Sequence, residues 1–125
     1  MAKKILIVED NLDMREVLHL YLKTENFDVV VASDGREGLY LARAEKPDLI
    51  ITDLHMPNLD GLTLVKELRA EPAFKDTPII VFTAFSREDR DNAIRAGANR
   101  AVDKPTHFES LIDDVHELLE ERKKP

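Results

Sequence analysis

Short apolar runs alternate with helical patterns along this chain, and few folds accommodate that alternation. Four runs are continuous instead of alternating with polar residues, which is typical of strands buried on both faces of a parallel sheet. These runs are Ile5–Val8, Val29–Val31, Leu49–Ile51 and Ile79–Phe82. A weaker fifth candidate strand is Arg100–Asp103. The pattern therefore predicts up to five buried strands in one sheet.

Apolar residues at helical spacing fill the intervals between the runs and follow the last one. Four of these five patterns begin at a candidate N-cap. The caps are Asn11, Asp60, Ser86 and Thr106, and the remaining pattern spans Glu37–Ala44. A strand–helix unit thus occurs five times. Right-handed crossovers then predict an α/β fold, a doubly wound parallel sheet with helices on both faces.

Polar residues end four of the predicted strands. Glu9 and Asp10 follow the first strand, Asp53 the third, Thr83 ends the fourth and Lys104 follows the fifth. Doubly wound sheets bind ligands at the carboxyl ends of their strands, so these groups should converge. Carboxylates in one cleft repel each other, and a hard cation such as Mg²⁺ relieves the repulsion. With a cationic lysine and a hydroxyl beside them, they fit phosphoryl transfer onto Asp53.

Composition limits the classes of protein further. The chain has 125 residues, which fits one domain, and a net charge of −7, which argues against broad binding to nucleic acid or to an anionic membrane. It has no cysteine, which excludes disulfides and thiolate metal sites. The first apolar run is too short for a signal peptide or a membrane span, and we expect a cytoplasmic protein.

Four stretches of the sequence resemble the receiver domains of two-component response regulators. They are KKILIVEDN (3–11), DLIITDLHMPNLDG (48–61), TPIIVFTA (77–84) and GANRAVDKP (97–105). Each stretch is a weak motif alone, but all four occur in order on the predicted element pattern. The resemblance covers essentially the whole chain. It implies one receiver domain over residues 1–125, with a flavodoxin-like five-stranded parallel sheet of order 2-1-3-4-5 and five helices.

The same resemblance implies a metal site. Asp10 would bind Mg²⁺ directly, and Glu9 would act through a metal-bound water. The backbone carbonyl of His55 would be the third protein ligand, beside Asp10 and Asp53. We interpret the imidazole of His55 as no ligand, because one histidine among hard carboxylates is poor evidence for a transition-metal site.

The resemblance also implies the phosphoryl chemistry. Asp53 would accept the group from a phosphohistidine of a sensor kinase or a phosphotransfer protein. Thr83 and Lys104 would contact the phosphoryl oxygens, and the Lys104–Pro105 bond would be cis. Beyond phosphorylating and dephosphorylating itself, such a chain is not an enzyme. His55 and Phe85 occupy positions that tune the lifetime of the phosphoryl group.

The predicted output is protein contact, since the sequence has no linker or DNA-binding part after the receiver. Family resemblance points to the face of the fourth helix, fifth strand and fifth helix, which would also serve a homodimer. One departure is Ala101, where receivers typically carry Tyr or Phe, so we expect the readout to use Thr83 and the loop with Phe85. A second departure is Asp103, which either pairs with Lys104 or faces solvent.

Three alternatives remain open at this point. The chain is a receiver-like scaffold that no longer switches, with Ala101 as its support. It is a metal-dependent aspartyl phosphatase, although such enzymes need a second acid where this chain has His55. Or it is a flavin carrier of the same topology, although the acidic stretch EDNLDM (9–14) replaces the phosphate loop that such a carrier needs.

Overall fold

The structure is a computed structural model, and it describes residues 2–83, 86–103 and 108–123. Five strands make one parallel sheet in the order β2-β1-β3-β4-β5. They are β1 (Lys4–Val8), β2 (Asp28–Ala32), β3 (Leu49–Thr52), β4 (Ile79–Thr83) and β5 (Arg100–Asp103). The predicted fold class and strand order are confirmed, including the weak fifth strand.

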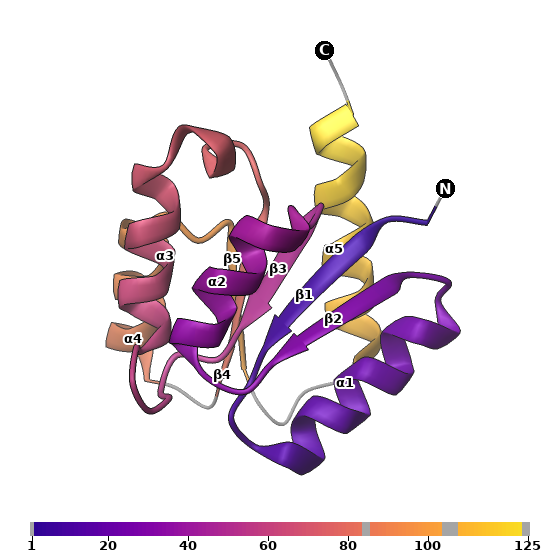
Figure 1. Ribbon diagram of the computed structural model, residues 1–125, viewed down its shortest axis with the longest axis horizontal. Coiled ribbons are helices and arrows are strands. Elements are labelled where there is room, and N and C mark those ends of the chain that lie inside the picture. Colours follow the sequence, from indigo (N-terminus) through magenta and orange to yellow (C-terminus); the bar gives the residue numbers. More distant parts are fainter. Residues whose placement is uncertain (1, 84–85, 104–107, 124–125) are drawn as a thin grey trace.

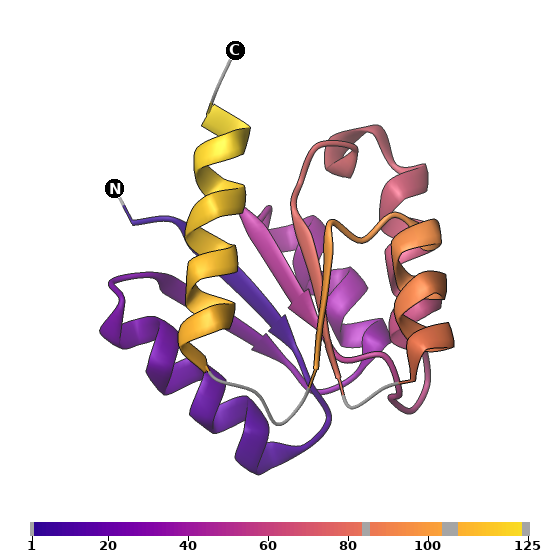
Figure 2. The same cartoon turned by 180° about the vertical axis from the view of Figure 1, so that it is seen from behind.

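Helices cover both faces of the sheet. They are α1 (Leu12–Thr24), α2 (Gly35–Glu45), α3 (Gly61–Ala70), α4 (Arg87–Ala96) and α5 (Phe108–Lys123). Figures 1 and 2 show α2, α3 and α4 on one face and α1 and α5 on the other. A short 3-10 turn, Pro72–Phe74, follows α3 and is not predicted by the sequence. Within the described ranges, no helix has both the length and the apolar character needed to cross a lipid bilayer.

Three of the predicted N-caps are confirmed by side-chain hydrogen bonds. Asn11 accepts from the Met14 N–H at 2.9 Å, Asp60 from Thr63 at 2.8 Å, and Ser86 from Asp89 at 3.2 Å. The fourth predicted cap, Thr106, lies outside the described residues. Such a cap satisfies one of the backbone donors that the first turn of a helix leaves unpaired. The sequence therefore fixes where α1, α3 and α4 begin.

The second helix begins earlier than predicted. Its first residue is Gly35, two positions before Glu37, and its N-cap is Asp34, whose side chain accepts from the Glu37 N–H at 2.9 Å. An Asp-Gly pair is a common turn signal, which masks the helix start in the sequence. Glycine is needed at this position because a Cβ atom would lie 1.9 Å from the carbonyl oxygen of Leu59, which belongs to the loop after β3.

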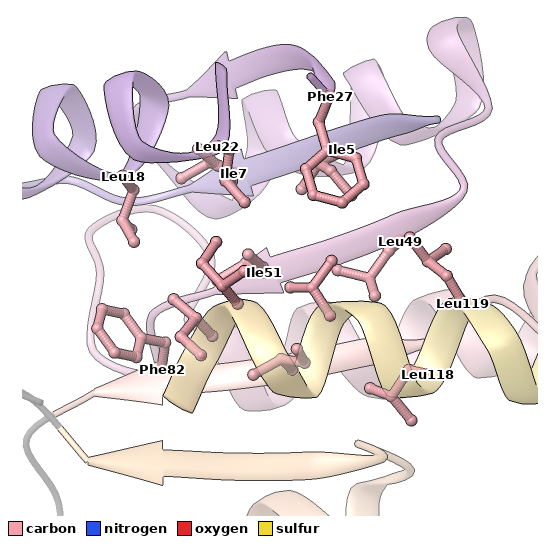
Figure 3. Packing of buried hydrophobic residues seen from close by; sticks show 14 residues of the cluster. Ile5, Ile7, Leu18, Leu22, Phe27, Leu49, Ile51, Phe82, Leu118 and Leu119 are labelled. Atoms are coloured by element: carbon pink, nitrogen blue, oxygen red, sulfur yellow. The ribbon is translucent and has the colours of Figure 1, made fainter. Parts of the chain in front are cut away.

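Two apolar layers hold the sheet between the helices. Ile5, Ile7, Leu49 and Ile51 pack with α1 and α5, and Figure 3 shows this layer. The neighbouring residues of the same strands, including Leu6 and Ile50, pack with α2, α3 and α4 on the other face. Burial on both faces explains why the strand sequences are continuous apolar runs. Polar groups gather at the carboxyl ends of the strands, which form one edge of the sheet, here called the rim.

Candidate functional site

Two neighbouring strands bring three carboxylates together at this rim. The last residues of β1 and β3, Val8 and Thr52, are register partners, and the Asp53 N–H donates to the Val8 carbonyl at 2.9 Å. Glu9 and Asp10 follow β1 directly. Carboxylate oxygens of Glu9, Asp10 and Asp53 lie within 4.8 Å of one another. The clustering predicted from the strand ends is thus present.

The three acids differ in exposure. Glu9 is 1% exposed and Asp53 is 8% exposed, whereas Asp10 lies open to solvent. Backbone donors reach both buried carboxylates: the Asn11 N–H donates to Glu9 Oε2 at 3.1 Å, and the Leu54 N–H donates to Asp53 Oδ1 at 2.7 Å. Burying a carboxylate is costly unless its charge is compensated, and these bonds compensate part of it.

The donor set fits a hard divalent cation. All three side chains offer carboxylate oxygens, the ligand type that Mg²⁺ and Ca²⁺ prefer, and the described residues add no sulfur or imidazole to the group. Two buried negative charges and a third beside them repel each other, and a bound cation removes that repulsion. We conclude that Glu9, Asp10 and Asp53 suit Mg²⁺ better than Zn²⁺.

The backbone of Glu9 is fixed from two sides. Its N–H donates to the Ala32 carbonyl of β2 at 3.0 Å, and its carbonyl accepts from Arg15 Nη1 of α1 at 2.9 Å. Arg15 was not predicted from the sequence, although its place in the first turn of α1 was the available signal. These bonds hold the acidic pair against the end of β1, so the position of Glu9 depends on β2 and α1 as well as on its own strand.

The loop after Asp53 is closed tightly. The Gly61 N–H donates to the Leu54 carbonyl at 2.7 Å. A Cβ atom on Gly61 would lie 2.0 Å from the Asp53 carbonyl oxygen, so no other residue fits without moving the backbone. Asp60 was predicted as a helix cap, and Gly61, directly after it, is the closing point of the loop that carries Asp53.

His55 extends away from the three carboxylates. Its side chain is 67% exposed, and its Nε2 lies 3.4 Å from Asp89 Oδ2 in the first turn of α4. The imidazole is thus placed between the loop and α4. That it is no metal ligand stays a prediction. The role of the His55 carbonyl stays a prediction.

Of the remaining predicted site residues, the structure describes only Thr83. Thr83 ends β4 in register with Asp103, the last residue of β5. Lys104, the Lys104–Pro105 bond and Phe85 lie outside the described residues, so their predicted roles are not tested. The backbone of β4 therefore brings Thr83 to the same edge of the sheet as the acidic cluster.

Comparison with known proteins decides the family. The model of the response regulator receiver domain matches residues 5–116. The chain belongs to this family. A probable transcriptional regulator ycf27 of Cyanophora paradoxa is 37% identical over 124 residues, covering 98% of this chain and 51% of that protein. An uncharacterised 14.6 kDa protein of Leptolyngbya boryana is 39% identical over 109 residues, covering 86% and 83%.

Some of the curated relatives of this receiver are longer than the chain. The regulator PhoP of alkaline phosphatase synthesis in Bacillus subtilis is 40% identical over 106 residues, which are 84% of this chain and 43% of PhoP. The receiver thus spans about half the length of several curated relatives.

Solved structures share the fold of the receiver. A putative response regulator of Chloroflexus aurantiacus superposes with a TM-score of 0.93 at 32% identity, covering 96% of this chain and 99% of that one. The receiver domain of the sensor histidine kinase PA1611 from Pseudomonas aeruginosa has a TM-score of 0.89 at 30% identity, with 96% and 99% coverage. That structure carries a magnesium ion in its active-site cleft.

The structure describes the surroundings of Ala101 and Asp103, the two departures from the usual receiver sequence. Ala101 is partly buried in the middle of β5, where it packs against the layer of α2, α3 and α4. Asp103 has a 60% exposed side chain, and its Oδ2 lies 3.7 Å from Arg90 Nη2 of α4. Most of the Asp103 side chain is thus open to solvent beside α4, and its predicted pairing with Lys104 falls outside the described residues.

Proposed function

We propose that the chain is a phosphoacceptor of a two-component phosphorelay, phosphorylated on Asp53. The observation that carries the proposal is the buried Asp53 beside Glu9 and Asp10 at the carboxyl edge of a receiver sheet. The donor would be a phosphohistidine of a sensor kinase or of a phosphotransfer protein. The relatives of this chain include proteins named as response regulators, such as MprA and ArlR, and this supports the proposed class of phosphodonor.

In the proposed reaction, a carboxylate oxygen of Asp53 attacks phosphorus. The P–N bond of the phosphohistidine breaks, and the imidazole nitrogen keeps its electron pair. The product is an acyl phosphate on Asp53. The Leu54 N–H orients the attacking carboxylate through its 2.7 Å bond to Oδ1. Thr83 and Lys104 are proposed to contact the phosphoryl oxygens, where a hydroxyl and a cation stabilise the spreading negative charge.

Mg²⁺ would be held by Asp10 and Asp53 and by the His55 carbonyl, with Glu9 acting less directly. When bound, it neutralises charge that develops on the phosphoryl group. The residues of the chain then have a simple division of roles. Glu9 and Asp10 supply the negative charge that attracts the cation, and Asp53 is both ligand and nucleophile.

Phosphorylation is proposed to alter a protein-binding face, not to start turnover of an outside substrate. The face of α4, β5 and α5 is the proposed contact for partners and for a homodimer. On this face, Arg100 Nη1 lies 2.6 Å from Asp114 Oδ1 and 3.5 Å from Glu117 Oε1. These ion pairs join β5 to α5. We further propose that the protein acts in the cytoplasm and does not itself bind nucleic acid, as its charge of −7 suggests.

Intact mass spectrometry tests the proposal. The wild type is incubated with acetyl phosphate with and without Mg²⁺, and Asp53→Asn is treated alongside. We expect one added phosphoryl group in the wild type with Mg²⁺ and none in the other samples. A folded wild type that gains no group and binds no beryllium fluoride would favour the non-switching scaffold. Steady hydrolysis of a small phosphomonoester would favour the phosphatase.

A further inference from the structure

The loop between β3 and α3, residues 53–60, is fastened to α2 by a side-chain hydrogen bond. Asn58 Nδ2 donates to Asp34 Oδ2 at 2.8 Å. Asp34 is also the N-cap of α2, because its Oδ1 accepts from the Glu37 N–H at 2.9 Å. One carboxylate therefore serves the helix with one oxygen and the loop with the other. Both bonds lower the pKa of Asp34 below its usual value, and the bond from the Glu37 N–H has the larger effect.

Backbone packing reinforces this contact. A Cβ atom on Gly35 would lie 1.9 Å from the Leu59 carbonyl oxygen, so the first residue of α2 lies directly against the loop. Glu37 returns its own side chain to Ser33, accepting from the Ser33 N–H at 2.6 Å. This bond ties the first turn of α2 to the residue before its N-cap, so Asp34 has side-chain hydrogen bonds of the same turn on both sides. The loop thus rests on a well-ordered helix start.

The loop has little freedom to move independently of Asn58. Asn58 has a left-handed backbone with φ of 70°, which asparagine adopts more readily than most residues. Pro57 before it has a fixed φ. On the far side, the Gly61 N–H closes the loop onto the Leu54 carbonyl. A shift of Asn58 would therefore be passed to His55 and Asp53 along a short loop whose far end is held at Gly61.

We propose that Asp34 is a positioning residue of the metal site: through Asn58 it holds the loop that presents Asp53 and the His55 carbonyl to Mg²⁺. This inference rests on the proposed function, in which the cleft binds that ion. Partners that orient metal ligands from behind typically change metal affinity by about 10- to 100-fold when they are removed. Asp34 acts through Asn58 and not on a ligand itself, so we expect about tenfold, the lower end of that range.

Two substitutions separate the loop contact from the helix cap. Asp34→Ser keeps a capping oxygen, since serine is as good an N-cap as aspartate, but removes the oxygen that accepts from Asn58. Asn58→Gly keeps the left-handed backbone and removes the amide. Asp60→Ser is the matched control, because Asp60 caps α3 in the same way and makes no other side-chain hydrogen bond in the described part of the chain.

The measurements are the Mg²⁺ dissociation constant by calorimetry and the backbone amide shifts of residues 54–56, 58 and 59 in metal-free protein. We expect Asp34→Ser and Asn58→Gly each to weaken Mg²⁺ binding about tenfold and to move the same amides. The double variant should bind no more weakly than either single one, because both lose the same contact. Asp60→Ser should bind as the wild type does.

The binding measurements separate failure of the proposed function from failure of the proposed role of Asp34. A wild type that binds no Mg²⁺ would overturn the proposed function itself. A wild type that binds Mg²⁺, with Asn58→Gly binding equally well, would overturn the role of Asp34 alone. Weaker binding by Asp34→Ser without any change in Asn58→Gly would also overturn it, since the helix cap would then be responsible. If Asp34→Ser does not fold, Asn58→Gly decides, because it leaves the cap of α2 in place.

Discussion

Single residues at the end of β3 determine how Asp53, the proposed nucleophile, is presented. Asp53 is held by the Leu54 N–H, and the loop behind it closes at Gly61, where the Asp53 carbonyl leaves no room for a side chain. The geometry of Asp53 therefore depends on a residue eight positions later in the sequence. This dependence gives a direct test of the loop closure.

Gly61→Ala should destabilise the protein by about 1–3 kcal/mol, the usual range for overpacking, because the new Cβ meets backbone at 2.0 Å. Gly38→Ala in α2 is the matched comparison. Its Cβ would lie 2.8 and 2.9 Å from the Val8 methyl carbons and 3.4 Å from the Val8 Cβ, so a side chain and not the backbone must shift, and alanine favours the helix by about 1 kcal/mol. Urea unfolding of both variants measures the difference. Equal losses of stability would contradict the closure at Gly61.

The sequence predicts the acidic residues of the cleft but not all that holds them. Glu9, Asp10 and Asp53 are predicted because strand ends meet at one edge, a property of backbone topology. The Asn58–Asp34 and Arg15–Glu9 contacts depend on side-chain direction and, for Asn58, on a partner 24 positions away. No local pattern encodes such a pairing, so these contacts were found only in the structure.

At the scale of elements, helix starts are the best predicted feature and irregular turns the worst. Asn11, Asp60 and Ser86 mark helix starts because a cap acts within one turn of the chain. The start of α2 was missed because Gly35 is needed for its approach to Leu59, which is a tertiary requirement. The turn Pro72–Phe74 was missed for a similar reason, since Phe74 is buried against the core.

The stability of α4 should depend on its N-cap more than the stability of the neighbouring helices depends on theirs. All ten residues of α4 are described, and only Ala93 is buried, so packing contributes little to its stability. We expect Ser86→Ala to cost about 1 kcal/mol, with faster hydrogen exchange of the α4 amides. Ser86→Asp should keep both near the wild-type values, because aspartate also caps. Unchanged α4 exchange in Ser86→Ala would show that packing holds this helix.

Over the whole molecule, two apolar layers on opposite faces of one sheet account for the stability. Adjacent residues of β3 belong to different layers: Ile51 packs with α1 and α5, and Ile50 with α2, α3 and α4. Both are essentially fully buried, at 1% and 0% exposure. This division follows from the twofold period of a strand, which the sequence shows only as a continuous apolar run.

Ile50→Val and Ile51→Val should each lower the free energy of unfolding by about 1 kcal/mol. Because the two side chains share no layer, the double variant should lose the sum within about 0.5 kcal/mol. Chemical denaturation of the two single variants and the double variant gives the three values. A coupling energy well above that margin would mean that the two side chains share one packing environment, contrary to the alternation described for β3.

Among the three clustered acids, Asp53 is the proposed phosphoacceptor. The most direct test is to phosphorylate the protein with acetyl phosphate and Mg²⁺, reduce it with borohydride and map its peptides by mass spectrometry. Borohydride converts an aspartyl phosphate to homoserine, which marks the residue. We expect homoserine at position 53 and intact Glu9 and Asp10. Reduction at Glu9, Asp10 or an acid outside the cluster, with Asp53 unchanged, would contradict it.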